Sequence, residues 1–129
     1  LLDLNKLRQV PCGELSKGEQ QRVGFLAAVI HQPKLLLLDE PMSGLDPKQM
    51  LEFRKFIRSG MKQRVTILST HLLNEIHAVC NKLLILREGK VVSFKEDLTS
   101  ESLSQLEQYF IHAVPGEERA TETRVVHSI

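Results

Sequence analysis

The stretch "KLLLLDEP", residues 34–41, decides how the whole sequence is interpreted. Four consecutive leucines are compatible with either a helix or a strand. Pro33 and Pro41, however, leave only seven residues between them. That is too short for a stable helix and suits a strand that is buried on both faces. Such a strand predicts a parallel sheet that is covered by helices.

A helix is predicted upstream of this strand, because Ser16 is a good N-cap and Glu19 stands three residues later, which makes a capping box. Apolar residues with helical spacing follow and end before Pro33. They predict one buried face, formed by Val23, Leu26, Ala27 and Ile30.

Further elements are predicted downstream. Asp46 and Pro47 form an N-cap followed by proline, which starts a helix. Residues 65–69, "VTILS", read as a second strand, residues 83–94 as a β-hairpin that turns at Glu88-Gly89, and residues 103–113 as a last amphipathic helix. This order predicts an α/β fold: a parallel sheet with flanking helices, then a C-terminal β-hairpin and helix.

Composition narrows the class of protein. The chain has 129 residues and a formal net charge of +1, with basic residues scattered along it. Proteins that bind nucleic acid usually show a basic stripe, so no nucleic-acid partner is expected. Cys12 and Cys80 are the only cysteines. They predict two reduced thiols and no disulfide framework.

Two adjacent acids follow the apolar strand, at the end of a parallel sheet where ligands bind. Asp39 is a candidate ligand for Mg²⁺, through a water molecule, because Mg²⁺ keeps much of its hydration shell. Glu40 points the other way along the pleat and is a candidate base for an attacking water. The alternative is an acid pair that is satisfied by backbone N–H groups.

His71 stands at the end of the second predicted strand. There it is a candidate contact for a terminal phosphate, or alternatively a helix cap. The helix start at Ser16 and Gly18 presents backbone N–H groups that suit a phosphate. Read locally, however, Ser16 and Glu19 are fully used by the capping box.

The combination of motifs is more specific than its parts. "LSKGEQQR", "LLLLDEPMSGLDP" and "ILSTH" occur in this order and closely resemble the ATP-binding cassette (ABC) ATPase family. Residues 15–22 look like the signature motif, residues 35–40 like Walker B, residues 43–46 like the D-loop, and His71 like the switch histidine. The resemblance covers residues 1–114 and implies part of a RecA-like P-loop NTPase sheet.

The resemblance also implies a function for each motif. ATP and Mg²⁺ are the expected cofactors: Asp39 serves Mg²⁺, Glu40 is the catalytic base and His71 contacts the γ-phosphate. Ser16 and Gly18 would reach ATP bound to a second nucleotide-binding subunit, and Asp46 would join the two sites. The implied protein hydrolyses ATP on the cytoplasmic face of the cell membrane and drives a separate transmembrane permease subunit.

The sequence departs from the family in two respects. Lys17 and Glu19 replace the usual glycine and glutamine of the signature, and no G-x-x-x-x-G-K-[ST] loop occurs anywhere in the chain. We therefore expect a C-terminal portion of an ABC ATP-binding subunit that has no measurable ATPase activity alone. The alternatives are a soluble ABC-type ATPase acting in DNA repair or on ribosomes, and a non-catalytic remnant that only binds a partner.

The expected portion divides into four parts. Residues 1–33 end a helical subdomain with the signature motif and its helix. Residues 34–94 hold Walker B, the D-loop, the switch histidine and the hairpin. Residues 95–114 hold the terminal helix, and residues 115–129, which turn polar after Pro115-Gly116, are expected to form a flexible tail.

Overall fold

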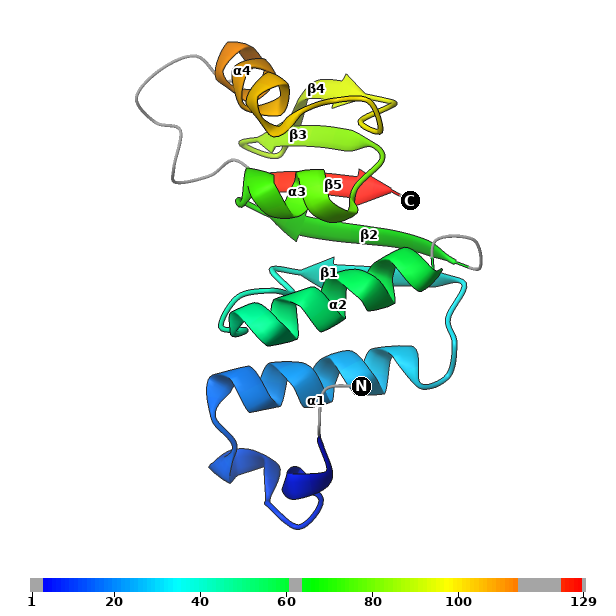
Figure 1. Ribbon diagram of the computed structural model, residues 1–129, viewed down its shortest axis with the longest axis vertical. Helices are drawn as coiled ribbons and strands as arrows, with labels where there is room; N and C mark the ends of the chain where they lie inside the picture. Colours follow the sequence, from blue (N-terminus) through cyan, green and yellow to red (C-terminus); the bar gives the residue numbers. More distant parts are fainter. Residues whose placement is uncertain (1–3, 61–63, 114–123, 129) are drawn as a thin grey trace.

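A five-stranded sheet forms the centre of the computed structural model, which describes residues 4–60, 64–113 and 124–128. Strand β1 (Leu35–Asp39) runs parallel to β2 (Val65–Thr70), with Leu35 opposite Val65 and Asp39 opposite Ser69. Both strands lie where the sequence predicted them. Their carboxyl ends meet at one edge of the sheet, so the residues that follow them are neighbours (Figure 1).

The rest of the sheet is antiparallel. Strands β3 (Leu83–Arg87) and β4 (Lys90–Lys95) form the predicted hairpin, and its turn at Glu88 and Gly89 has positive φ angles of 50° and 73°. These angles suit the primed turns that match the twist of a hairpin. The predicted parallel pair, β1 and β2, and the predicted antiparallel hairpin are both present; the two pairs made by a further strand were not predicted.

Strand β5 (Arg124–Ser128) corrects the expectation of a flexible tail. It lies between β2 and β3 and pairs antiparallel with both, so the strand order is β1-β2-β5-β3-β4. The polar composition before it concealed a short β-branched segment, "RVVHS". Residues 115–123 and 129 of the predicted tail lie outside the described residues.

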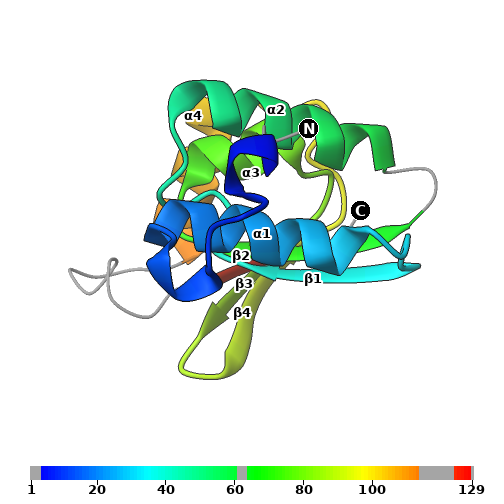
Figure 2. The same ribbon diagram turned by 90° about the horizontal axis from the view of Figure 1, so that it is seen from below.

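In the described part of the chain, four helices accompany the sheet: α1 (Lys17–Val29), α2 (Pro47–Gly60), α3 (Leu73–Val79) and α4 (Leu103–Ala113). Short 3₁₀ turns, η1 (Leu4–Leu7) and η2 (Cys12–Glu14), precede α1. Helices α2, α3 and α4 lie on the same side of the sheet, and α1 packs beside α2 near the β1 edge (Figures 1 and 2). The core lies between these helices and the sheet and includes Leu36, Phe53, Ile57, Leu68, Ile76, Leu83, Ile85 and Leu106.

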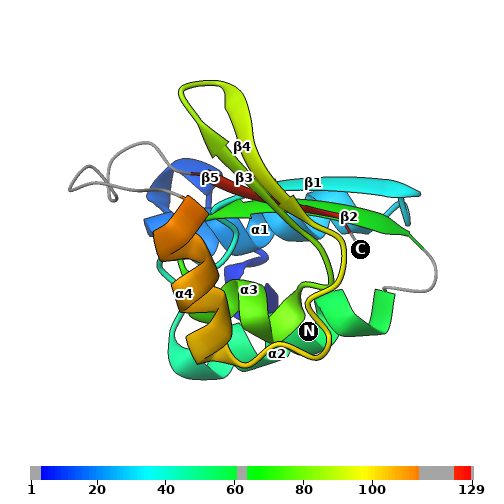
Figure 3. The same ribbon diagram turned by 90° about the horizontal axis from the view of Figure 1, so that it is seen from above.

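The opposite side of the sheet has no helix over it in the part of the chain that the structure describes (Figures 2 and 3). Leu35 and Leu37 of β1 are 52% and 65% exposed there, beside Val65 of β2. Only the alternate residues face the helices, with Leu36 fully buried. The prediction that this strand is buried on both faces is therefore wrong.

Helix α1 buries a different face from the one that periodicity predicted. Phe25 and Val29 are buried, whereas Ile30 is 73% exposed and Ala27 is also exposed. The ring of Phe25 packs against Phe53 of α2, with centroids 4.7 Å apart. An aromatic ring removes more apolar area from water than an alanine or a valine, so Phe25 decides which side of α1 faces the core.

Helices α2 and α3 are joined by a buried ion pair. Arg54 donates to Glu75 through Nε (3.0 Å) and Nη2 (2.7 Å). Glu75 is only 1% exposed, and the hydrogen bonds that its carboxylate accepts raise the pKa of Arg54. Helix α2 follows the predicted D-loop and α3 follows His71, so this pair fixes the two segments relative to each other.

None of the described helices is both long and apolar enough to cross a membrane.

Candidate active site

The predicted base and the predicted phosphate contact lie together at the carboxyl ends of β1 and β2. Glu40 Oε1 is 2.8 Å from His71 Nδ1. An ionised carboxylate only accepts hydrogen bonds, so the Nδ1 proton of His71 is directed at Glu40. Thr70 Oγ1 donates to the other carboxylate oxygen at 3.4 Å. The imidazole is 65% exposed, so a ligand can reach its second nitrogen.

Asp39 lies on the open face of the sheet, on the opposite side of the pleat from its neighbour. Its Oδ1 accepts a hydrogen bond from Ser69 Oγ of the adjacent strand. An exposed carboxylate beside a hydroxyl fits a hydrated Mg²⁺, which takes few protein ligands and completes its shell with water and phosphate oxygens. No group of three or more His, Cys, Asp or Glu side chains among the described residues could hold a metal by itself.

The capping box at the start of α1 forms as predicted. Ser16 Oγ accepts from the Glu19 amide at 3.4 Å and donates to Glu19 Oε2 at 2.7 Å. The same oxygen accepts from the Ser16 amide at 2.9 Å. These hydrogen bonds lower the pKa of Glu19, so the carboxylate is charged at neutral pH. The Ser16 hydroxyl is exposed, and its proton already has a partner within the chain.

Asp46 caps α2 in the same manner. Its Oδ1 accepts from the Gln49 amide at 2.9 Å, and its own amide donates to Gln49 Oε1 at 3.3 Å. Residues 43–46 reach this helix through Gly44, whose φ of +74° favours glycine. The carbonyl of Gly44 lies so close to Gly18 that a Cβ placed on Gly18 would be 3.0 Å away. The start of α1 therefore touches the loop that leads into the start of α2.

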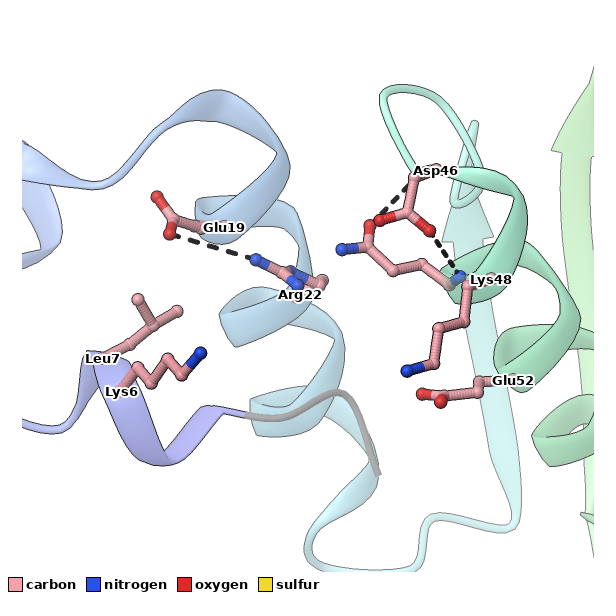
Figure 4. A pocket seen from close by; sticks show the side chains of 8 residues that line it. Lys6, Leu7, Glu19, Arg22, Asp46, Lys48 and Glu52 are labelled. Carbon is pink, nitrogen blue, oxygen red and sulfur yellow. Dashed lines mark hydrogen bonds and ion pairs between the residues drawn. The ribbon is translucent and has the colours of Figure 1, made fainter.

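A cleft of about 270 Å³ lies between these two helix starts (Figure 4). Basic and acidic side chains line it in equal number, together with Leu7 and Gln49; the basic ones are Lys6, Arg22 and Lys48, and the acidic ones are Glu19, Asp46 and Glu52. The guanidinium of Arg22 is directed at Glu19 of the same helix, with Nη2 4.0 Å from Oε1. The signature-like and D-loop-like segments thus face one cleft, while Glu40 and His71 belong to the strand ends.

Sequence reasoning missed the residues that hold these groups in place. Gln21 Nε2 donates to the carbonyl of Glu40 at 2.7 Å, and Ser69 donates to Asp39. The only available signal for Ser69 was its place two residues before His71 on a strand. Gln21 gave no signal, because a glutamine in the middle of a helix is normally a solvent-exposed helix former.

Comparison with known proteins shows which family this chain belongs to. A family model described as "AAA domain, putative AbiEii toxin, Type IV TA system" matches residues 1–76. The chain belongs to the AAA domain family. This family is an AAA-type P-loop NTPase family and implies nucleotide binding. It also confirms the predicted fold class, with its small parallel sheet and flanking helices.

The resemblance to ABC proteins is confirmed by curated relatives. The uncharacterized ABC transporter ATP-binding protein YhcH of Bacillus subtilis is 34% identical over 108 residues, which are 82% of this chain and 35% of the relative. Protein MJ1023 of Methanocaldococcus jannaschii, with the same description, is 46% identical over 82 residues, 63% of this chain and 31% of the relative. The lantibiotic transport ATP-binding protein SrtF of Streptococcus pyogenes is 38% identical over 104 residues, 80% of this chain and 45% of the relative. The chain thus spans about a third to under a half of the length of these relatives.

Proposed function

We propose that this chain is the portion of an ABC transporter ATP-binding subunit that carries the catalytic base. The observation that carries the proposal is the 2.8 Å contact between Glu40 and His71 at the ends of two parallel strands. A carboxylate in such a position can take a proton from an attacking water. The exposed imidazole beside it can contact the phosphoryl group that is transferred.

Positioning and charge neutralisation account for most of the catalysis of phosphoryl transfer. Bound Mg²⁺ supplies charge neutralisation on the phosphate oxygens. Asp39 would hold it on the open side of the pleat, with Ser69 orienting the carboxylate. Glu40 lies on the other side of the backbone, so the acid that serves the metal and the acid that serves the water do not compete for one position.

The proposal extends to partners. Ser16 and Gly18 at the start of α1 would contact ATP that is bound to a second nucleotide-binding subunit, and Asp46 would link the two sites. The close approach of Gly18 to Gly44, in the loop before α2, supports a joint role. Such a dimer would act on a transmembrane permease subunit from the cytoplasmic face of the membrane. The names of the relatives as transporter ATP-binding proteins support this partner.

The sequence contains no phosphate-cradling G-x-x-x-x-G-K-[ST] loop, so the proposal places that loop on polypeptide outside residues 1–129. The chain alone should bind MgATP weakly and should show no measurable turnover. An isolated chain whose turnover is abolished by Glu40→Gln would contradict this part of the proposal.

A chimera tests the function directly. Residues 1–129, which include β5, replace the aligned segment of YhcH, whose remaining length supplies the rest of the subunit. We expect ATP turnover that falls at least a hundredfold in Glu40→Gln, the usual lower range for a general base, and falls less in His71→Ala. Glu107→Gln, which makes the same change on an exposed acid of α4, is the matched control and should keep turnover. A folded chimera that hydrolyses ATP equally well with Glu40→Gln would refute the proposal.

A further inference from the structure

The backbone of Glu40 has a conformation that needs support. Its φ angle is +44°, in the left-handed region that side chains other than glycine, asparagine and aspartate seldom adopt. Three hydrogen bonds hold it there. Its amide donates to the carbonyl of Ser69 at 3.0 Å, and its carbonyl accepts from the amide of Ser43 at 3.1 Å and from Gln21 Nε2 at 2.7 Å.

Gln21 is the only one of these three partners that comes from outside the strand ends and the loop after β1. It belongs to α1, one turn beyond Gly18, which packs against the carbonyl of Gly44. The first two turns of α1 therefore touch the segment of residues 40–44 at both of its ends. One end of this segment is the predicted base, and the other begins the D-loop-like turn.

We propose that Gln21 is a positioning residue that couples the start of α1 to Glu40. The inference rests on the proposed function. A displacement of α1 moves Gln21 and, through its hydrogen bond, the Glu40 carbonyl. The Glu40 carboxylate then changes its approach to His71. A ligand that binds at the start of α1 near Ser16 thereby changes the position of Glu40 in the same chain.

Nuclear magnetic resonance of the chain as it stands tests the coupling. Gln21→Met keeps the length of the side chain and removes the donor, whereas Gln21→Glu places an acceptor against the carbonyl. Gln108→Met makes the same change on an exposed residue of α4, at the opposite end of the molecule (Figure 1). We expect both Gln21 variants to shift the Glu40 amide and the His71 ring resonances, and the control to leave both unchanged.

A second measurement separates positioning from stability. Gln21→Met in the chimera should lower kcat about tenfold, the effect of one lost hydrogen bond of ordinary strength, and should leave KM for ATP unchanged. Equal Glu40 and His71 resonances in wild type and both Gln21 variants would overturn the inference. The inference would also be overturned if Gln21→Met left kcat unchanged in a chimera that Glu40→Gln inactivates.

The two proposals fail in distinguishable ways. If Glu40→Gln leaves turnover intact, the proposed function fails, while the resonances of Glu40 and His71 still decide whether Gln21 sets their geometry. If the chimera has no activity at all, the Glu40 and His71 resonances of wild type and the Gln21 variants alone decide whether Gln21 positions Glu40. The two Gln21 variants perturb the same hydrogen bond in different ways. A general loss of structure would instead also shift the amide resonances of the distant helix α4.

Discussion

Removing Arg54 should leave a charge stranded inside the protein. Arg54 binds Glu75 through two hydrogen bonds of 3.0 and 2.7 Å, and Glu75 is 1% exposed. Breaking a buried ion pair from one side costs about 3–5 kcal/mol, because the remaining ion has lost both its partner and its water. The Arg54 side chain is 31% exposed, which places the expected loss for Arg54→Met at the lower limit, about 3 kcal/mol.

A double-mutant cycle measures this effect. Urea unfolding, followed by far-ultraviolet circular dichroism, gives the free energy of unfolding for wild type, Arg54→Met, Glu75→Met and the double variant. Replacing both ions with apolar side chains of similar size is often neutral. We therefore expect the double variant to be clearly more stable than Arg54→Met alone.

Arg58→Met is the matched control. Arg58 lies one turn further along α2 and donates to the carbonyl of Ala78 from an exposed position, so its loss should cost about 1 kcal/mol. If Arg54→Met costs no more than Arg58→Met, or if the double variant is as unstable as Arg54→Met, the reasoning about the stranded Glu75 charge is refuted.

Three further results are expected. Burial raises the pKa of the Cys80 thiol, so a thiol reagent should modify Cys12 alone in the folded chain and both cysteines after unfolding; rapid modification of both would contradict this. Hydrogen bonds from Ser16 lower the pKa of Glu19, so the stability that the Glu19 carboxylate contributes is present at neutral pH and is lost as the pH falls through that lowered pKa. In thermal melts at a series of pH values, Glu19→Gln should be less stable than wild type at pH 7, and the difference should vanish in acid. Leu37→Lys replaces a side chain that is 65% exposed, so the free energy of unfolding should change by less than about 0.5 kcal/mol. Light scattering at high protein concentration should decrease, because an exposed apolar side chain is removed. A large loss of stability would show that Leu37 is buried in solution.

Local signals predicted the elements well. Pro33 and Pro41 fixed β1, the capping residues fixed the start of α1, and Asp46 fixed the start of α2, because caps and prolines act on the backbone within a few residues. Glu40 and His71 were predicted to share one sheet edge, and the parallel register of β1 and β2 brings them together.

Properties that depend on distant partners were not predictable in the same manner. Burial of β1 depends on whether a second layer covers the sheet, and four leucines in a row say nothing about that. The buried face of α1 depends on where the rings of α2 lie, so the periodic pattern favoured Ala27 and Ile30 over Phe25. The role of Gln21 depends on a hydrogen bond to a carbonyl, which any residue type at position 40 would present.

The position of β5 has a consequence for the order of folding. Strands β1 and β2 are linked by one helix, and β3 and β4 by a tight turn, so each pair can form early from nearby segments. Strand β5 pairs with β2 and β3 only after long stretches of chain have been brought together, and such non-local pairings are slow. The sheet should therefore assemble as two independent halves, and β5 should be the late, rate-limiting bridge between them.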